Sequence, residues 1–208
     1  MIQASKERVG KIVVRELTPE LLSDYLGFFD KDAFADNTWW SGCYCGFWDD
    51  KCADNDWDAG PTGGPAHRQA REERIRNGLA HGLLAFIEYK PVGWCNAGPR
   101  ASYVNLRAFS AAVDNPKEPV GSILCFVVAA PFRGKGVASA LLDAACTSFR
   151  REGLTIAEAY PRTSPSKIPE LPWGAQNYHG PLEMYLKNGF TIHRQLERWA
   201  ILRKPLSE

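Results

Sequence analysis

The chain has 208 residues, of which 45% are hydrophobic and 24% charged, and seven of them are tryptophan. This composition excludes disordered and fibrous proteins and predicts one globular domain over residues 1–208. Twenty-five basic and twenty-four acidic residues give a formal net charge of +1. Because no overall field would hold such a chain on nucleic acid or an anionic membrane, a small-molecule partner is expected, and a homodimer stays open.

Targeting signals are not evident in the sequence. The first fourteen residues mix charged and apolar side chains, and no run reaches the length of a signal-peptide core or a membrane span. A cytoplasmic location with reduced cysteines is therefore expected.

Before residue 100 the sequence predicts a strand at residues 11–17 and a helix at 18–29. A long irregular segment follows at 36–64, then a short helix at 66–78 and a hairpin at 83–96. Thr18-Pro19 is typical of a helix start, and Gly78 of a helix stop. Residues 36–64 hold four tryptophans, three cysteines and six aspartates without a sustained period, which indicates a long ordered loop.

The second half opens with the clearest strand, Gly121–Ala130, whose continuous apolar run predicts burial on both faces. After it we expect a helix at residues 134–152, a strand at 154–160 and a second loop at 161–178. A short helix at 182–188, ended by Gly189, and two final strands at 190–192 and 199–202 complete the chain. The order is that of a mixed α/β (α+β) protein without internal repeats.

A glycine-rich turn joins the best strand to the following helix, as Arg133-Gly134-Lys135-Gly136-Val137-Ala138. Such a turn lets a ligand approach the backbone and aims helix amides at an anion, here suited to a pyrophosphate. The P-loop pattern fails because valine follows Gly136, and the G-x-G-x-x-G fingerprint fails because Ser139 occupies its third glycine position.

The segment does match the Q/R-x-x-G-x-G/A signature of the GNAT superfamily of N-acetyltransferases. Met184-Tyr185-Leu186-Lys187-Asn188-Gly189-Phe190 resembles the closing Y-x-x-x-G-F element of the same family. The resemblance implies a mostly antiparallel sheet flanked by helices, with two central strands parted around the slot for coenzyme A. It also implies an enzyme that transfers an acetyl group from acetyl-CoA to a primary amine by direct attack, with a small molecule as the expected acceptor.

By the same resemblance, the backbone of three strand residues pairs with the pantetheine arm, and seven loop and helix residues hold the pyrophosphate. These are Phe126, Val127 and Val128, followed by Arg133, Gly134, Lys135, Gly136, Val137, Ala138 and Ser139. A strand amide near Val128 would stabilise the oxyanion.

The sequence gives weaker evidence for the residues that transfer protons. The resemblance makes Tyr185 the candidate donor to the leaving thiolate, although a tyrosine on a short helix is more often a core residue. Strand Gly121–Ala130 holds no carboxylate, so Glu158, His179 and Glu183 remain candidate bases, and a water chain is an alternative.

The aromatic loop 36–64 lies where the family builds its acceptor site, and Trp40, Tyr44 and Trp48 are the expected substrate contacts. Aromatic faces with Asp49, Asp50, Asp54 and Asp56 nearby would attract a cationic amine, whereas the alternative is a cap on the core. Loop 161–178, with Trp173 and Asn177, is expected to share this role.

Two other readings stay open. The missing strand carboxylate would suit a non-catalytic acyl-CoA-binding sensor or interaction module. A zinc-stabilised binding protein would use Cys43, Cys45, Cys52 and His67, but the C-x-C spacing is unusual for structural zinc, so no metal is expected.

Overall fold

A computed structural model of the chain describes residues 10–48, 64–108, 115, 117–164 and 173–206. Its centre is a seven-stranded sheet in the order β1-β2-β3-β4-β5-β7-β6. The strands are β1 Val13–Glu16, β2 Leu83–Ile87, β3 Lys90–Pro99, β4 Val120–Val128, β5 Ile156–Ala159, β6 Thr191–Gln195 and β7 Ala200–Pro205. Among these described strands, β4 and β5 pair in parallel and all other neighbours are antiparallel.

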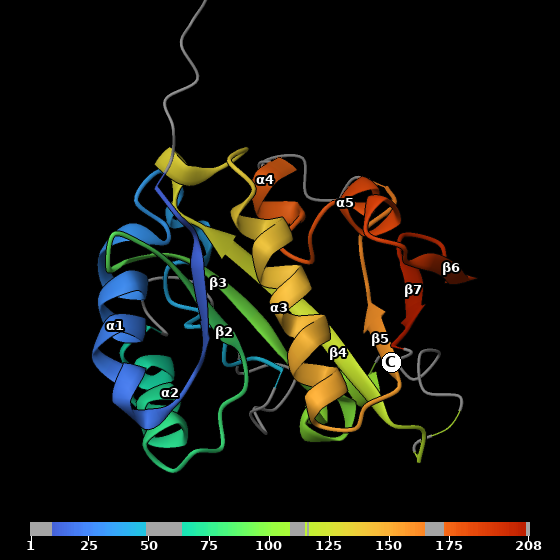
Figure 1. The fold of residues 1–208 in the computed structure, drawn as a ribbon. Helices are drawn as coiled ribbons and strands as arrows, with labels where there is room; N and C mark the ends of the chain where they lie inside the picture. Colours follow the sequence, from blue (N-terminus) through green and yellow to red (C-terminus); the bar gives the residue numbers. More distant parts are fainter. Residues whose placement is uncertain (1–9, 49–63, 109–114, 116, 165–172, 207–208) are drawn as a thin grey trace, which may run out of the picture.

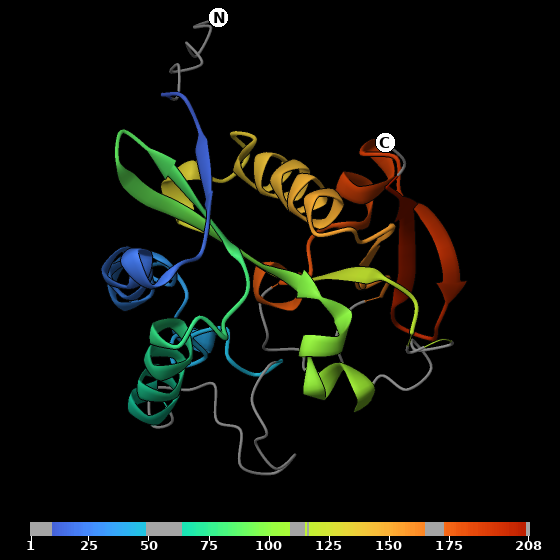
Figure 2. The ribbon, with the colours of Figure 1, turned by 60° about the horizontal axis from the view of Figure 1, so that its bottom comes forward.

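Helices cover both faces of the sheet (Figures 1 and 2). Their bounds are α1 Leu22–Gly27, α2 Gly64–Arg76, α3 Val137–Arg151, α4 Trp173–Gln176 and α5 Leu182–Lys187. A π-helical turn, Phe28–Asp32, extends α1. Helices α1 and α2 lie on one face, while α3 and α5 lie on the other (Figure 2).

Helix α3 packs through an apolar stripe. Residues Val137, Leu141, Ala145 and Phe149 recur every four positions and are all buried in the core between α3 and the sheet. A second core, around Tyr25, Phe28 and Trp94, fills the space between the sheet and α1. Two cores on opposite faces hold the central strands in place.

The predicted mixed, mostly antiparallel fold is confirmed. The hairpin forms between β2 and β3, and its turn places Glu88 and Tyr89 at positive φ. The glycine stops also form, because Gly78, Gly153 and Gly189 have φ of 65°, 76° and 80°. Among the residues described, no helix is long and apolar enough to cross a membrane.

Three expectations need correction, and the first is the loop 161–178, which contains the short helix α4, Trp173–Gln176. The segment 36–64 is not one irregular loop, since Thr38–Trp40 forms a 3₁₀ turn and α2 already begins at Gly64. Strand β4 is buried only as far as Cys125, and its last three residues are half-buried because they border an open space.

Candidate functional site

Strands β4 and β5 part midway. Their pairing covers only Val120–Ile123 on β4, with Ile123 opposite Ala159, the last residue of β5. On the β3 side, Asn96 pairs with Cys125 and Ala97 with Ile123, so Leu124 is an extra residue on β4. A bulge of this kind bends its strand, and the splay of β4 away from β5 begins at the same residue.

The parted half of β4 presents backbone groups to the gap. Along an antiparallel strand successive residues alternate between facing the partner and facing away. Since the Ala129 amide bonds to Val92 on β3, Phe126 and Val128 face the gap. The Phe126 amide donates to the Tyr178 carbonyl at 2.6 Å, and Arg133 Nε donates to the Val128 carbonyl at 2.9 Å. Hydrogen bonds within the chain thus already occupy two of the backbone groups that the family resemblance assigns to the pantetheine arm.

At the end of this gap the chain turns into α3 through two glycines at positive φ. Gly134 and Gly136 have φ of 71° and 87°, and a Cβ on either would meet no heavy atom within 4 Å. Gly136 is the N-cap of the 15-residue helix α3. Because glycine has no side chain, this N-cap supplies no hydrogen-bond acceptor to the backbone amides of the first helical turn. The turn therefore has the backbone form and the open space that an anionic group requires.

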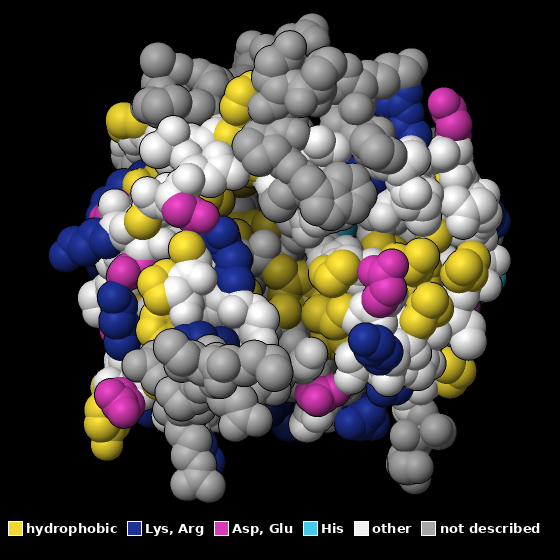
Figure 3. All heavy atoms as spheres, turned by 90° about the horizontal axis from the view of Figure 1, so that it is seen from above, with side chains coloured by type: hydrophobic (Ala, Val, Ile, Leu, Met, Phe, Trp, Pro, Cys, Tyr) yellow, Lys and Arg dark blue, Asp and Glu magenta, His cyan; other side chains and the backbone are white. Residues whose placement is uncertain are grey.

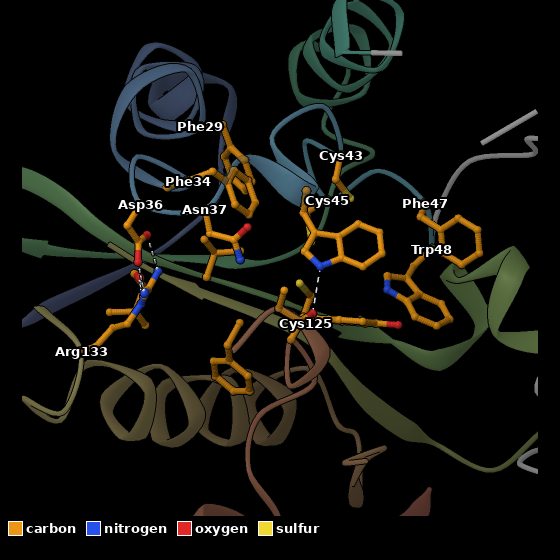
Figure 4. A pocket seen from close by; sticks show the side chains of 17 residues that line it. Phe29, Phe34, Asp36, Asn37, Cys43, Cys45, Phe47, Trp48, Cys125 and Arg133 are labelled. Carbon is orange, nitrogen blue, oxygen red and sulfur yellow. Dashed lines mark hydrogen bonds and ion pairs between the residues drawn. The ribbon is translucent and has the colours of Figure 1, made fainter. Parts of the chain in front are cut away.

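A pocket of about 680 Å³ runs along the parted half of β4. Figure 4 shows its side chains, with Asp36 and Arg133 at one end and Phe47 and Trp48 at the other. The face seen in Figure 3 is hollowed near its centre, and hydrophobic side chains gather there. The described wall comprises Phe29, Ala33, Phe34, Asp36, Asn37, Trp40, Cys43, Cys45, Phe47, Trp48, Cys125, Phe126, Val127, Val128, Arg133, Ala175 and Tyr178.

An ion pair lies at one end of the pocket. The Arg133 guanidinium donates to both carboxylate oxygens of Asp36, at 2.6 and 3.0 Å, and lowers the pKa of Asp36. Both side chains are about half exposed. Arg133, predicted to contact the pyrophosphate, thus already has an anionic partner, which sequence reasoning did not indicate.

Two of the three predicted acceptor residues line the pocket. The Trp40 indole Nε1 donates to the Ala175 carbonyl at 2.9 Å, so it bridges the two loops, and its ring meets Tyr178 edge to face. Trp48 is buried at the far end. Phe29 in the π-helical turn, and Ala33 and Phe34 directly after it, also line the pocket, but no local signal in the sequence marked them.

Tyr44 does not line the pocket, which corrects the third prediction. Its hydroxyl donates to Asp30 at 2.7 Å, and its carbonyl accepts from Tyr25 at 2.5 Å. Asp30 in turn pairs with Arg68 on α2. Tyr44 therefore ties the loop to α1 and α2. The predicted carboxylates Asp49, Asp50, Asp54 and Asp56, together with Cys52, lie outside the described residues, as does the Trp173 side chain.

Tyr185 lies on α5, entirely buried between Phe126 and Phe190. Its hydroxyl donates to the His179 carbonyl at 2.5 Å, and burial raises its pKa well above the usual value. The group is therefore protonated at neutral pH. Its ring centroid is 6.4 Å from that of Phe126, whose backbone faces the gap.

Glu158 sits in a buried network of charges below the point where β4 and β5 part. Arg203 Nε donates to one carboxylate oxygen and the Tyr160 hydroxyl to the other, both at 2.6 Å, and Arg100 lies 3.4 Å away. With both oxygens occupied and no exposed surface, Glu158 serves to join β5, β7 and the segment after β3.

His179 is 1% exposed and packs against the rings of Trp48, Tyr178 and Trp199. Burial lowers its pKa to about 3, although the nearby Leu124 backbone opposes this shift. The ring is therefore neutral at physiological pH. Glu183, the other candidate base, lies in the first turn of α5 and is not part of the pocket wall.

Five of the cysteines are described, and all are free thiols. The described part of the chain contains no group of three or more His, Cys, Asp or Glu side chains able to hold a metal. His67 Nδ1 contacts the Gly42 carbonyl at 2.9 Å, so it faces a backbone oxygen.

Comparison with known structures gives the same fold. An N-acetyltransferase from Staphylococcus aureus Mu50 has a TM-score of 0.53 at 15% identity, over 95% of this chain and all of that one. The PaiA N-acetyltransferase from Thermoplasma acidophilum in complex with coenzyme A has 0.52 at 15%, over 94% and 99%. YncA from Salmonella typhimurium with its cofactor acetyl-CoA has 0.52 at 14%, over 95% of both chains.

No curated protein sequence is similar enough to this chain to count as a match. The family model of the acetyltransferase (GNAT) family, however, matches residues 39–165, more than half of the chain. That stretch includes the parted strand, the glycine turn and α3, but ends before Tyr185. The chain therefore belongs to the GNAT family of acetyltransferases, enzymes that use acetyl-CoA as their co-substrate.

Proposed function

We propose that this protein acetylates a primary amine of a small molecule by direct attack in a ternary complex with acetyl-CoA. The observation that carries this proposal is the parted half of β4, which has the glycine turn at one end and a pocket of about 680 Å³ along its length. The far end of the described wall holds the buried Trp48, so the pocket is a hollow lined by side chains rather than a flat surface, which favours a small acceptor over a protein surface.

The glycine turn is assigned to the pyrophosphate. The open space outside Gly134 and Gly136 and the first-turn amides of α3 fit two phosphate groups without rebuilding the backbone. Phe126, Val127 and Val128 are assigned to the pantetheine arm, and residues 133–139 to the pyrophosphate. When bound, acetyl-CoA supplies an activated acetyl group as a thioester.

Strand β4 also supplies the proposed oxyanion contact. The amides of Phe126 and Val128 both face the gap in a fixed orientation. Of the two, Phe126 lies farther from the glycine turn, at the end of the pantetheine arm where the thioester would lie, so we assign to it the contact with the oxygen that becomes negative. The Tyr178 carbonyl occupies this amide, which becomes available when the turn at Asn177–Gly180 moves.

Tyr185 is the proposed proton donor to the departing sulfur. Its raised pKa keeps the proton in place at neutral pH, and its neighbour Phe126 borders the gap. To act, the hydroxyl must turn from the His179 carbonyl, which the same movement of the Asn177–Gly180 turn would permit. Glu158 is not assigned as base, because both its oxygens accept hydrogen bonds from buried partners.

The test is initial-rate kinetics, with release of free thiol from acetyl-CoA measured over a panel of primary amines. Varying both substrates should give intersecting double-reciprocal lines, as a ternary complex requires. Parallel lines would indicate a covalent acetyl-enzyme and refute direct attack. Thiol release that no amine accelerates, from a protein that binds acetyl-CoA, would contradict the proposed acceptor class.

A further inference from the structure

The chemistry of the pocket wall narrows the acceptor, and this step rests on the proposed function. Seven of its described residues are aromatic: Phe29, Phe34, Trp40, Phe47, Trp48, Phe126 and Tyr178. The charged side chains of the described wall are Asp36 and Arg133, and they neutralise each other at the end next to the glycine turn. Figure 4 shows that pair well apart from Phe47 and Trp48.

The far end of the pocket is where an acceptor would meet the acetyl group. The pantetheine arm, assigned to Phe126–Val128, leads from the glycine turn toward the bulge at Leu124, a span of about 13 Å for four strand residues. Cys125 and Trp48 line the wall beyond it. This end of the described wall has no carboxylate.

The remaining ionisable groups on that wall are three thiols and one phenol. Loss of solvation raises the pKa of Cys43 to about 12 and raises that of Tyr178, while the hydrogen bond to Cys45 raises the pKa of Cys125. Burial also acts to raise the pKa of Cys45, but Cys125 and the Arg71 charge outweigh it and lower that pKa. Because Arg71 is itself buried beside this site, any charge on Cys45 is balanced.

A primary amine in water is mostly an ammonium ion, which cannot attack a thioester. Transfer into an apolar wall disfavours the charged form and lowers the pKa of the amine, while aromatic faces offset only part of this cost. Such a wall generates the neutral nucleophile without a protein carboxylate. Burial of an apolar body strengthens the binding of the amine that it carries. A second cation on the same body would lose its hydration and find no counter-ion in the described wall.

We infer that the acceptor is a primary amine carried by an aromatic or otherwise apolar body, which the pocket holds as the free base between Trp40, Trp48 and Tyr178. The described part of the wall disfavours polyamines and other polycationic amines, because it offers a second cation no unpaired carboxylate. Desolvation takes the place of the general base that β4 lacks: the ammonium ion gives its proton to solvent on entry. After attack, the nitrogen loses a second proton, directly or through water, to the Tyr185 phenolate that remains once Tyr185 has protonated the leaving sulfur.

A matched pair of substrates tests this inference on the unmodified protein. Benzylamine and 4-(aminomethyl)benzylamine share one ring and one reacting group, but the second carries an additional cation. We expect kcat/KM for benzylamine to be at least 30-fold higher, and its affinity for the protein–CoA complex, from calorimetry, to be higher by a similar factor. Equal or reversed preference, or no binding of either amine, would overturn the inference.

Acetyl-CoA binding separates this failure from that of the proposed function. A protein whose melting temperature acetyl-CoA raises, but which prefers the diamine, refutes only the acceptor class. A protein that neither binds acetyl-CoA nor releases thiol refutes the proposed function as well.

Variants of the wall provide the second test. Trp40→Leu should raise KM for benzylamine at least tenfold with KM for acetyl-CoA unchanged, whereas Trp39→Leu should leave both unchanged, because Trp39 is exposed and outside the wall. Phe47→Glu, at a half-buried position, adds a carboxylate to the wall and should shift the preference toward the diamine by tenfold or more. Phe47→Gln is its neutral control. An unchanged preference in a folded Phe47→Glu protein would contradict the inference.

Discussion

Gly136 offers a sharp test of the cofactor assignment, because α3 carries a matched control at its other end. Gly136 precedes the helix with φ of 87° and Gly153 follows it with φ of 76°, and at neither position would a Cβ meet a heavy atom within 4 Å. An alanine at either position costs about 1–2 kcal/mol of backbone strain. In a chain of this size each kcal/mol lowers the melting temperature by roughly 2–4 °C. The two alanine variants should therefore lose similar stability.

Gly136→Asp adds a negative charge against the pyrophosphate as well. Two unit charges about 5 Å apart at an effective dielectric of about 20 repel by about 3 kcal/mol. That repulsion weakens binding by roughly 100-fold. At a hundred times the wild-type Kd, acetyl-CoA stabilises the wild type by about 2.7 kcal/mol and the variant by only about 0.4 kcal/mol. The expected thermal shifts are about 5–11 °C and about 1 °C.

The assay is thermal unfolding with and without acetyl-CoA, on the wild type and on alanine and aspartate variants at both glycines. Gly153→Asp should destabilise the free protein, since it places a negative charge at the helix C-terminus, but keep the full ligand shift. A folded Gly136→Asp protein with the wild-type shift would refute the assignment of the loop. So would an equal loss of the shift in Gly153→Asp.

Three further predictions concern side chains of the site. Tyr185→Phe should lower kcat by about 10- to 1000-fold with little change in acetyl-CoA affinity, and equal turnover where chemistry limits the rate would remove it from the mechanism. Glu158→Gln should cost about 1.5–3 kcal/mol of stability, seen in denaturant unfolding, because buried Arg100 and half-buried Arg203 lose one anionic partner and keep only Glu118; a loss under about 1 kcal/mol would contradict the buried network. Asp36→Asn should lower the Kd for acetyl-CoA about threefold, by freeing Arg133 for a phosphate. Asp32→Asn, which breaks the distant ion pair with Lys90, should leave the Kd for acetyl-CoA unchanged. Weaker binding of acetyl-CoA by Asp36→Asn would refute the idea that Asp36 competes with the phosphates for Arg133.

The glycine turn could be predicted because its signal is local. A continuous apolar run, two glycines and an amphipathic stretch follow one another within thirty residues, and each has a direct backbone consequence. The structure places positive φ at Gly134 and Gly136 and starts α3 at Val137. The parting of the strands is different, because the bulge at Leu124 lies within a run whose residues are all apolar and leaves no mark on the pattern.

The pocket wall could not be predicted, because its contacts join residues far apart in the chain. Trp40 bonds to the backbone of Ala175, 135 residues away, and Arg133 pairs with Asp36, 97 residues away. No periodicity encodes such contacts. Composition suggested an acceptor loop but not which side chains face inward, so Trp40 and Trp48 line the pocket while Tyr44, between them, faces Asp30.

The apolar wall beside β4 accounts for the lack of a carboxylate on that strand. A pocket that binds the ammonium form needs an anion to hold the charge and a base to remove the proton, and one carboxylate often serves both purposes. A pocket that favours the free base needs neither, because burial itself shifts the protonation equilibrium of the amine. In the described wall, the carboxylate that is present is neutralised by Arg133, and the buried imidazole of His179 is neutral. The chemistry of this site is then governed by which amines lose their proton at low cost on entry, so that for acceptors of one shape the rate should increase as their basicity falls toward neutral pH.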